Sequence, residues 1–277
     1  MSRSNIAIIG CGYIGEAVAL DRTEKGDHVT ATARTPERLD DLSKVAQKSV
    51  ILKGNDEDEF IPLIANNQTI LVTVAPESVE YYESAYLHTA EIFRRLALEM
   101  DLPRNIIFTS STSVYGDHQG MWVDETSDLL AKDEQAKILI EAEKTYASLE
   151  ELGWDVCIFR LAEIYGPEKE LSKKVRSAAT HAVPGEGNRF TNMIHKADCV
   201  NAIHFALRYN LRGIYNLADD DHPTRQELYD MVAKEYMLPA VKWDPTVTSL
   251  HSGNKRVSNH KIKKAGYKFI HPHRVLD

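Results

Sequence analysis

Three glycines near the N-terminus have the spacing of a dinucleotide-binding turn. Gly10, Gly12 and Gly15 form Gly-x-Gly-x-x-Gly where an apolar run ends and a helical pattern begins. The first glycine permits a tight turn, the second lets the backbone approach a pyrophosphate, and the third allows close packing of helix on strand. The helix N-terminus adds free N–H groups and the positive end of a dipole. This placement predicts a bound dinucleotide cofactor.

The end of the second apolar run indicates which dinucleotide is preferred. An NAD site usually has Asp or Glu there to bind the ribose 2′-hydroxyl. This chain has Ala33 at that position and Arg34 after it, so no carboxylate repels a 2′-phosphate and a guanidinium can bind it. NADP is the expected cofactor and NAD the alternative, for which Arg34 and Arg38 would be ordinary surface residues. Asn55, just past the third run, is placed to contact the adenine edge.

These residues need a sheet that brings the ends of several strands together. Apolar runs suited to buried parallel strands alternate with helix-like stretches, which indicates βαβ units. We predict an α/β fold, a doubly wound parallel sheet of the Rossmann type with helices on both faces. The runs cover residues 5–10, 28–33, 49–53, 69–75, 105–111 and 155–161, a further strand is expected at 213–218, and helical patterns cover 14–25, 78–100, 130–151, 196–209 and 224–237.

The pattern changes after residue 166. Pro167 breaks it, a glycine-rich turn follows at 183–190, and the later helical stretches are short. We expect residues 1–166 to form the NADP-binding domain. Residues 167–277 are expected to form a smaller C-terminal part that is interleaved with the sheet and binds the substrate.

Composition excludes several classes of protein. The formal net charge of −8 argues against a nucleic-acid partner, because phosphate binding needs a basic face. One basic run, 253–268, is interpreted either as a solvated surface or as a contact for an anionic substrate. The three cysteines and 11 histidines lack disulfide or metal-site spacing, so no metal is expected. Because no apolar run is long enough to span a membrane, we expect a soluble, cytoplasmic protein.

Several strings resemble the extended short-chain dehydrogenase/reductase pattern of nucleotide-sugar epimerases and dehydratases. They are GCGYIG at 10–15, VTVAP at 72–76, SSTSVYG at 110–116 followed by VDET, and FRLAEIYGP at 159–167. The C-terminal strings TNMIHKADCVNAI, IYNLADDDHP and VSNHKIKKAGYKFIHP are most similar to the YeeZ-like atypical members of this superfamily. The resemblance covers nearly the whole chain. It is specific for fold and cofactor and much less so for the reaction.

The resemblance also implies roles for single residues. Ser111 matches the active-site serine, and Asn192 and His195 fall on the substrate side, although a histidine in such a segment is more often structural than functional. Glu163 stands where relatives usually have a small residue, so it is either a candidate acid/base group or a loop residue paired with a neighbouring base. The implied cofactor contacts are Gly10, Gly12, Tyr13, Ile14 and Gly15 on the pyrophosphate, Arg34 on the adenosine, Val74, Ala75 and Pro76 near the nicotinamide ribose, and Leu161 and Ala162 beside the nicotinamide.

The acid/base pair of the family is missing. In the family a Tyr transfers the proton and a Lys four residues later lowers the pKa of that Tyr. One register of the 130–151 helix puts Gln135 at the Tyr position and Leu139 at the Lys position; the other keeps Lys137 but puts Asp133 at the Tyr position. The chain is therefore expected to be an atypical member. Proton transfer is expected from Ser111, Glu163, His195 or an ordered water.

Two functions follow from these observations. In the first, the chain is an NADP-dependent oxidoreductase, or an epimerase/dehydratase-like enzyme, acting on a small polar substrate that is nucleotide- or sugar-linked. In the second, it is a sensor that holds NADP(H) and reports redox state to a partner without turnover. By analogy with the fold, the expected assembly is a homodimer through residues 78–100 and 130–151.

Overall fold

A computed structural model describes residues 3–53, 56–76, 78–100, 102, 104–247 and 253–276. Its central sheet has seven strands in the order β11-β7-β5-β4-β1-β2-β3. They are β1 (Asn5–Ile9), β2 (His28–Ala33), β3 (Lys48–Ile51), β4 (Thr69–Val72), β5 (Asn105–Ser111), β7 (Asp155–Leu161) and β11 (Gly213–Leu217).

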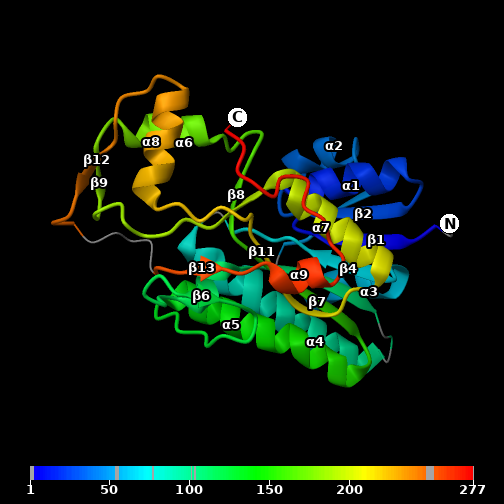
Figure 1. The fold of residues 1–277 in the computed structure, drawn as a ribbon. Helices are drawn as coiled ribbons and strands as arrows, with labels where there is room; N and C mark the ends of the chain where they lie inside the picture. The colour runs from blue at the N-terminus through cyan, green and yellow to red at the C-terminus, as the bar shows by residue number, and fades with distance from the viewer. Residues whose placement is uncertain are drawn as a thin grey trace. The chain divides into compact units, whose positions relative to one another are not determined.

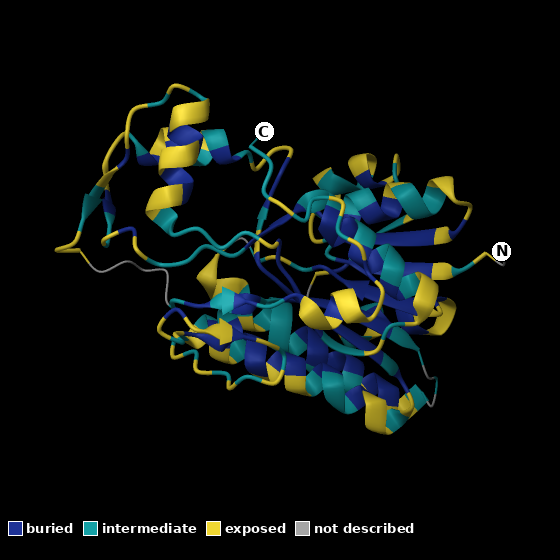
Figure 2. Cartoon of the chain, in the orientation of Figure 1, coloured by how far each residue is buried: buried dark blue, intermediate teal, exposed yellow. Residues whose placement is uncertain are grey.

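The predicted doubly wound parallel sheet is confirmed. Strand β1 pairs in parallel with both β2 and β4, and the order reverses at β1 as it does in a doubly wound sheet. Helices α1 (Gly15–Glu24) and α2 (Leu39–Leu42) lie on one face, and α4 (Thr89–Met100) and α5 (Glu134–Ala147) lie on the other (Figure 1). The strands are rich in Ile and Val and largely buried, as a sheet covered on both faces requires (Figure 2).

Two predicted helices begin later than expected. Residues 78–100 form a 3₁₀ turn (Val79–Tyr81), a π-helical turn (Ser84–His88) and then α4. In the π turn Tyr86 packs on Tyr82 and Phe108, with ring centroids 4.8 and 6.1 Å apart, and regular α-helix begins at Thr89. Helix α5 begins at Glu134 rather than 130, because the Asp133 carboxylate accepts a hydrogen bond from the Ala136 N–H at 2.9 Å.

The chain divides into two compact units, each discontinuous in sequence. Unit 1 comprises residues 1–110, 137–159 and 200–214, and unit 2 comprises 111–136, 160–199 and 215–277. Strands β5, β7 and β11 therefore begin in unit 1 and end in unit 2. The expected boundary after residue 166 divides the chain into two continuous segments, whereas each of these units is made of several segments. That boundary stays a prediction.

The described residues of unit 2 form three small two-stranded sheets. These pair β6 (Trp122–Val123) with β13 (Arg256–Val257), β8 (Glu163–Tyr165) with β10 (Met193–His195), and β9 (Ala182–Pro184) with β12 (Lys242–Asp244). Its helices are α6 (Leu171–Ala178), α8 (Arg225–Glu235) and α9 (His260–Lys264). The remaining helices of the described ranges are α3 (Glu57–Asn66) in unit 1 and α7 (Lys196–Tyr209), which begins in unit 2 and ends in unit 1.

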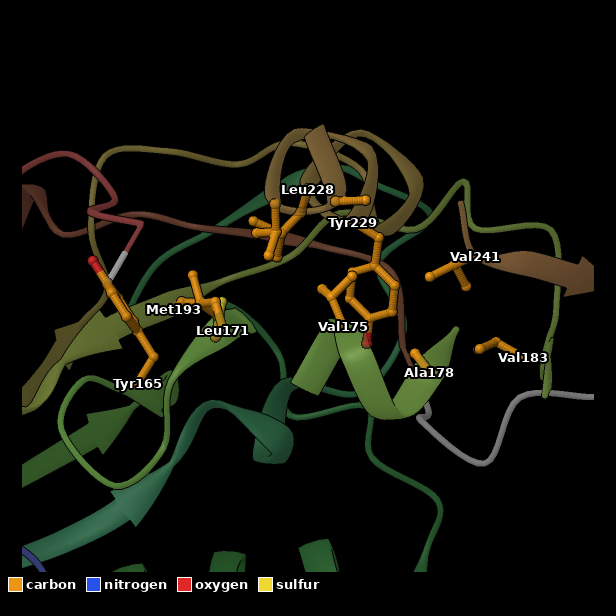
Figure 3. Close-up of a cluster of buried hydrophobic side chains, with 11 residues drawn as sticks. Tyr165, Leu171, Val175, Ala178, Val183, Met193, Leu228, Tyr229 and Val241 are labelled. Atoms are coloured by element: carbon orange, nitrogen blue, oxygen red, sulfur yellow. The ribbon is translucent and has the colours of Figure 1, made fainter. Parts of the chain in front are cut away.

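A second hydrophobic core lies inside unit 2. Helices α6 and α8 pack against each other through Leu171, Val175, Leu228 and Tyr229, each at most 2% exposed (Figure 3). Helix α8 starts with a capping box, in which the Thr224 hydroxyl and the Glu227 carboxylate bind each other's backbone N–H. None of the helices in the described ranges is both long and apolar enough to span a membrane.

Leu228→Ala is expected to lower the free energy of unfolding of the protein by about 2–5 kcal/mol, because it leaves a cavity in the core of unit 2. Met231→Ala on the same helix is the control, since Met231 is 47% exposed. Urea denaturation of both variants measures the difference. Equal loss in the two variants would contradict the assignment of this core.

Candidate functional site

The glycine turn between β1 and α1 is held by contacts from β2 and β4. Gly10 has a φ of +74°, and a Cβ there would lie 2.7 Å from Val74 Cα. The Gly10 N–H donates to the Thr32 hydroxyl at 3.1 Å, and the Cys11 N–H donates to the Thr32 carbonyl at 3.1 Å. Only glycine satisfies this combination of left-handed backbone and close approach.

Gly15 allows the start of helix α1 to press on the sheet. A Cβ there would lie 2.8 Å from Thr73 Oγ1 and 3.1 Å from the Ile8 side chain. The Thr73 hydroxyl in turn donates to the Gly10 carbonyl at 2.9 Å. Any larger side chain at Gly15 would separate the helix from the strand.

Gly12 differs from the other two glycines because nothing within the described chain requires it. Its φ is not positive, and a Cβ there would have no heavy atom of the described residues within 4 Å. The space above Gly12 is therefore open at the N-terminus of a helix, where phosphate oxygens are favoured. The turn fits a dinucleotide, whose pyrophosphate needs this close approach to the backbone.

A pocket of about 500 Å³ opens beside the glycine turn and lies within unit 1. The pocket is lined by residues at the ends of β1, β2 and β3 and in the segment that follows β4. Five residues with an expected cofactor role line it: Gly10, Arg34, Val74, Ala75 and Pro76. Its other lining residues are Ile9, Thr32, Ala33, Leu52, Lys53, Phe60, Glu80, Tyr81, Ser84, Ala85 and Thr89.

Two cationic side chains, Arg34 after β2 and Lys53 after β3, line this pocket. The Arg34 guanidinium lies 5.3 Å from the centroid of the Tyr81 ring, a cation–π contact that holds the side chain beside the pocket. Lys53, at the end of β3, is exposed and lines the same pocket. Sequence reasoning missed Lys53 and Tyr81, although the pairing of β2 with β3 would have placed Lys53 near Ala33. Asn55 lies outside the described residues.

The other residues with an expected cofactor role lie in the glycine turn and at the end of β7. Tyr13 and Ile14 lie in the glycine turn, Tyr13 partly buried and Ile14 buried. Leu161 and Ala162 come at the end of β7 and are buried, and the Ala162 N–H donates to the Leu217 carbonyl at 2.9 Å.

In unit 2, Ser111 starts a short turn rather than pairing with a base. Its hydroxyl accepts a hydrogen bond from the Ser113 N–H at 3.1 Å and caps the 3₁₀ turn Thr112–Tyr115. At the end of that turn Tyr115 is fully buried, donates to Asn216 Oδ1 at 2.8 Å and accepts from Arg160 at 3.0 Å. Burial raises the pKa of Tyr115 to about 12, although Arg160 opposes the shift. Tyr115 is thus a structural residue.

The start of α5 has no tyrosine to take its place. Gln135 is half-buried, Leu139 is buried in the core, and Lys137 is exposed. The buried leucine at the expected Lys position leaves no ammonium on that face of the helix.

Glu163, Asn192 and His195 come together at the paired strands β8 and β10. The Glu163 N–H donates to the Asn192 carbonyl at 3.1 Å. The Glu163 side chain is 53% exposed and forms an ion pair with Lys174 of α6, which is the neighbouring base that the alternative interpretation required. Ser111, in contrast, lies at the end of β5.

His195 is buried and tightly packed. Its Nδ1 accepts from the Ala197 N–H at 3.2 Å, and its ring lies against Tyr165 and His271 at 5.2 and 4.1 Å. A Cβ on Gly166 would lie 2.8 Å from His195 Nε2. This packing favours the structural interpretation of the histidine.

The Asn192 side chain is engaged on both sides. Its amide N–H donates to the Lys255 carbonyl at 2.9 Å, and its Oδ1 accepts from the Val257 N–H at 2.7 Å and from His222 Nδ1 at 3.0 Å. Burial lowers the pKa of His222 to about 4, so this imidazole is neutral at pH 7. Asn192 therefore fixes the segment 255–257 in unit 2.

Comparisons with known proteins agree with this architecture. Over almost its whole length the chain is similar to Protein YeeZ of Escherichia coli (strain K12), with 27% identity covering 96% of each chain. A functionally unknown conserved protein from Silicibacter pomeroyi DSS has a similar fold, with a TM-score of 0.79, 23% identity and coverage of 98% and 95% of the two chains. The UDP-glucose 4-epimerase of Thermus thermophilus, in complex with NAD, has a TM-score of 0.77 at 16% identity, covering 95% and 93%.

A family model matches residues 6–218, which include the glycine turn, the pocket and the strands that carry Ser111 and Glu163. With this match over most of its length, the chain belongs to the NAD dependent epimerase/dehydratase family.

Proposed function

We propose that this chain binds NADP(H) in the pocket of unit 1 and works as an oxidoreductase or epimerase/dehydratase-like enzyme. The observation that carries the cofactor proposal is the open space at Gly12. No contact within the described chain requires a glycine at this position, whereas a bound pyrophosphate would. The nicotinamide of the bound cofactor would accept or donate a hydride. Gly10, Gly12 and Gly15 would hold the pyrophosphate, with Tyr13 and Ile14 beside it.

The preference for NADP over NAD rests on charge. Ala33 offers no carboxylate to the ribose, and the cations Arg34 and Lys53 line the same pocket. A 2′-phosphate gains a charge-assisted bidentate contact from a guanidinium, whereas a 2′-hydroxyl gains much less. The acidic side chain among the described lining residues is Glu80, which comes from the segment after β4.

The proposed substrate is a small polar molecule that is nucleotide- or sugar-linked. The Thermus thermophilus relative in fold is a UDP-glucose 4-epimerase. We assign substrate binding to residues 167–277, with Asn192 on the substrate side, and catalysis to the neighbourhood of Ser111, Glu163 and His195. A cytoplasmic homodimer is part of the same proposal, by analogy with the fold.

One observation favours the second candidate function, an NADP(H)-binding sensor without turnover. Gln135 and the buried Leu139 stand where an acid/base pair would stand, and Tyr115 is locked by Arg160 and Asn216. A sensor needs the cofactor pocket but no proton-transferring group.

Arg34→Ala is expected to weaken NADPH binding by about 1.5–3 kcal/mol, the range for a hydrogen bond to a charged group, and to leave NADH binding nearly unchanged. Fluorescence titration of both cofactors measures the effect. Arg95→Ala is the control, because Arg95 forms an ion pair with Glu57 and does not line the pocket. Equal affinity of the wild type for NADPH and NADH would refute the NADP preference.

Enzyme and sensor are separated by a turnover screen. Sugar nucleotides and small carbonyl compounds are incubated with NADPH, and oxidation is followed by absorbance. On any substrate, Ser111→Ala is expected to lower kcat about a hundred-fold or more, the range for loss of a positioned proton-transfer group. Ser113→Ala removes a hydroxyl from the same turn and should have little effect. Turnover that survives both Ser111→Ala and Glu163→Gln would refute the site, and tight NADPH binding without any turnover would favour the sensor.

A further inference from the structure

Unit 2 holds a buried lysine whose amine has few hydrogen-bond acceptors. Lys255 is 6% exposed, and its Nζ donates to the Gly116 carbonyl at 3.2 Å. Gly116 is the one hydrogen-bond acceptor that Nζ has among the described residues. A lysine ammonium has three N–H donors, so two of them have no acceptor in the described chain, in a place almost closed to solvent. Such an amine is suited to bind an oxygen of a ligand.

The backbone around Lys255 is fixed from both sides. Asn254 accepts hydrogen bonds at its carbonyl from the N–H groups of His118 and Gly120, at 3.0 and 2.9 Å. The Lys255 carbonyl accepts from the Asn192 side chain at 2.9 Å. The backbone of Lys255 is therefore held in place, and the burial of its side chain limits the movement that a surface lysine would have.

Its position joins two segments that matter for the proposed reaction. Gly116 ends the turn that Ser111 begins, so Lys255 contacts the same turn as the serine. The Asp133 carboxylate, which caps α5 two residues before Gln135, is close enough to act on the charge of Lys255. Lys255 thus reaches, from a distant part of the chain, the region where Gln135 replaces an acid/base residue.

The surroundings of Lys255 favour reversible protonation of its amine. Burial lowers the pKa of Lys255 to about 8, and the carboxylates of Asp117 and Asp133 oppose the shift. Asp117 in turn faces Arg189 as well as Lys255, which weakens its hold on the ammonium. A group that titrates near the working pH can both accept and donate a proton.

We propose that Lys255 is a proton-transferring residue of this protein beside the Ser111 turn, with its Nζ exchanging a proton with the reacting oxygen of the substrate. The proposal rests on the proposed oxidoreductase function. In the oxidation direction, the neutral amine of Lys255 would accept the O–H proton of the substrate alcohol, and a bound oxidised nicotinamide would supply the hydride acceptor. The products would be a carbonyl compound, reduced cofactor and the ammonium of Lys255. Reduction runs the same transfers in reverse.

A chemical probe tests the proposal without a known substrate. The folded protein is treated with formaldehyde and cyanoborohydride between about pH 6 and 10, and methylation of each lysine is measured by mass spectrometry of peptides. Lys255 is expected to react in spite of its burial, with a rate that levels off near its pKa of about 8. The exposed Lys234 is the comparison lysine in the same digest. A Lys255 that stays unmodified while surface lysines react, or that follows their pH dependence, would show a structural ammonium and overturn the proposal.

Variants provide the second readout. Lys255→Met is expected to lower kcat about a hundred-fold or more, to leave KM nearly unchanged and to remove the pH dependence near the pKa of the amine. Lys255→Arg keeps the charge but not the neutral base and should not restore turnover, and Lys234→Met is the matched control. Lys255→Met should bind NADPH like the wild type. Failure of the wild type to bind NADPH would refute the proposed function and this proposal with it, whereas binding with an inert Lys255 would refute this proposal alone.

Discussion

The close approach of three strands at Gly10 is the constraint on which the cofactor pocket depends. Strand β1 lies between β2 and β4. The turn that follows β1 lies so close to Val74 that no Cβ fits at Gly10. Thr32 and Thr73 tie the same turn to both neighbouring strands through hydroxyl hydrogen bonds. These contacts hold the turn in position, and the turn leads directly into helix α1. The N-terminus of α1 borders the open space at Gly12. Gly10 and Val74, which form this close contact, also line the pocket.

The chemical groups of the chain are distributed differently from its binding groups. Unit 1 holds the pocket beside the glycine turn, and unit 2 holds the polar side chains for which we propose a role in catalysis or substrate binding. Within unit 2 most of those side chains are already engaged: Glu163 with Lys174, Tyr115 with Arg160, and Asn192 with the segment 255–257. Lys255 stands apart because its burial is not matched by acceptors among the described residues. Among the described residues, Lys255 thus has unused hydrogen-bonding capacity at the turn that Ser111 begins.

The parts of this structure that local patterns encode could be predicted from sequence. Buried parallel strands are continuous Ile- and Val-rich runs, and a glycine turn is a fixed spacing, so the sheet and the position of Gly10 followed directly. The pocket lining could not, since Lys53 and Tyr81 meet Arg34 only through the order of the strands. Lys255 was hidden for a further reason. It lies in a basic run that is typical of a solvated surface, and its burial depends on contact with Gly116, 139 residues away in sequence.

The most direct test of the cofactor site is the affinity of Gly12→Val for NADPH. Gly12 does not have a positive φ, and a Cβ there would have no neighbour within 4 Å among the described residues, so valine should not disturb the fold. Its branched side chain would instead occupy the approach of the pyrophosphate. Fluorescence titration, with circular dichroism to verify folding and with Gly12→Ala as the smaller change, measures the effect. We predict a folded variant with no detectable NADPH binding. A folded Gly12→Val with the affinity of the wild type would contradict the assignment of the pyrophosphate to this turn.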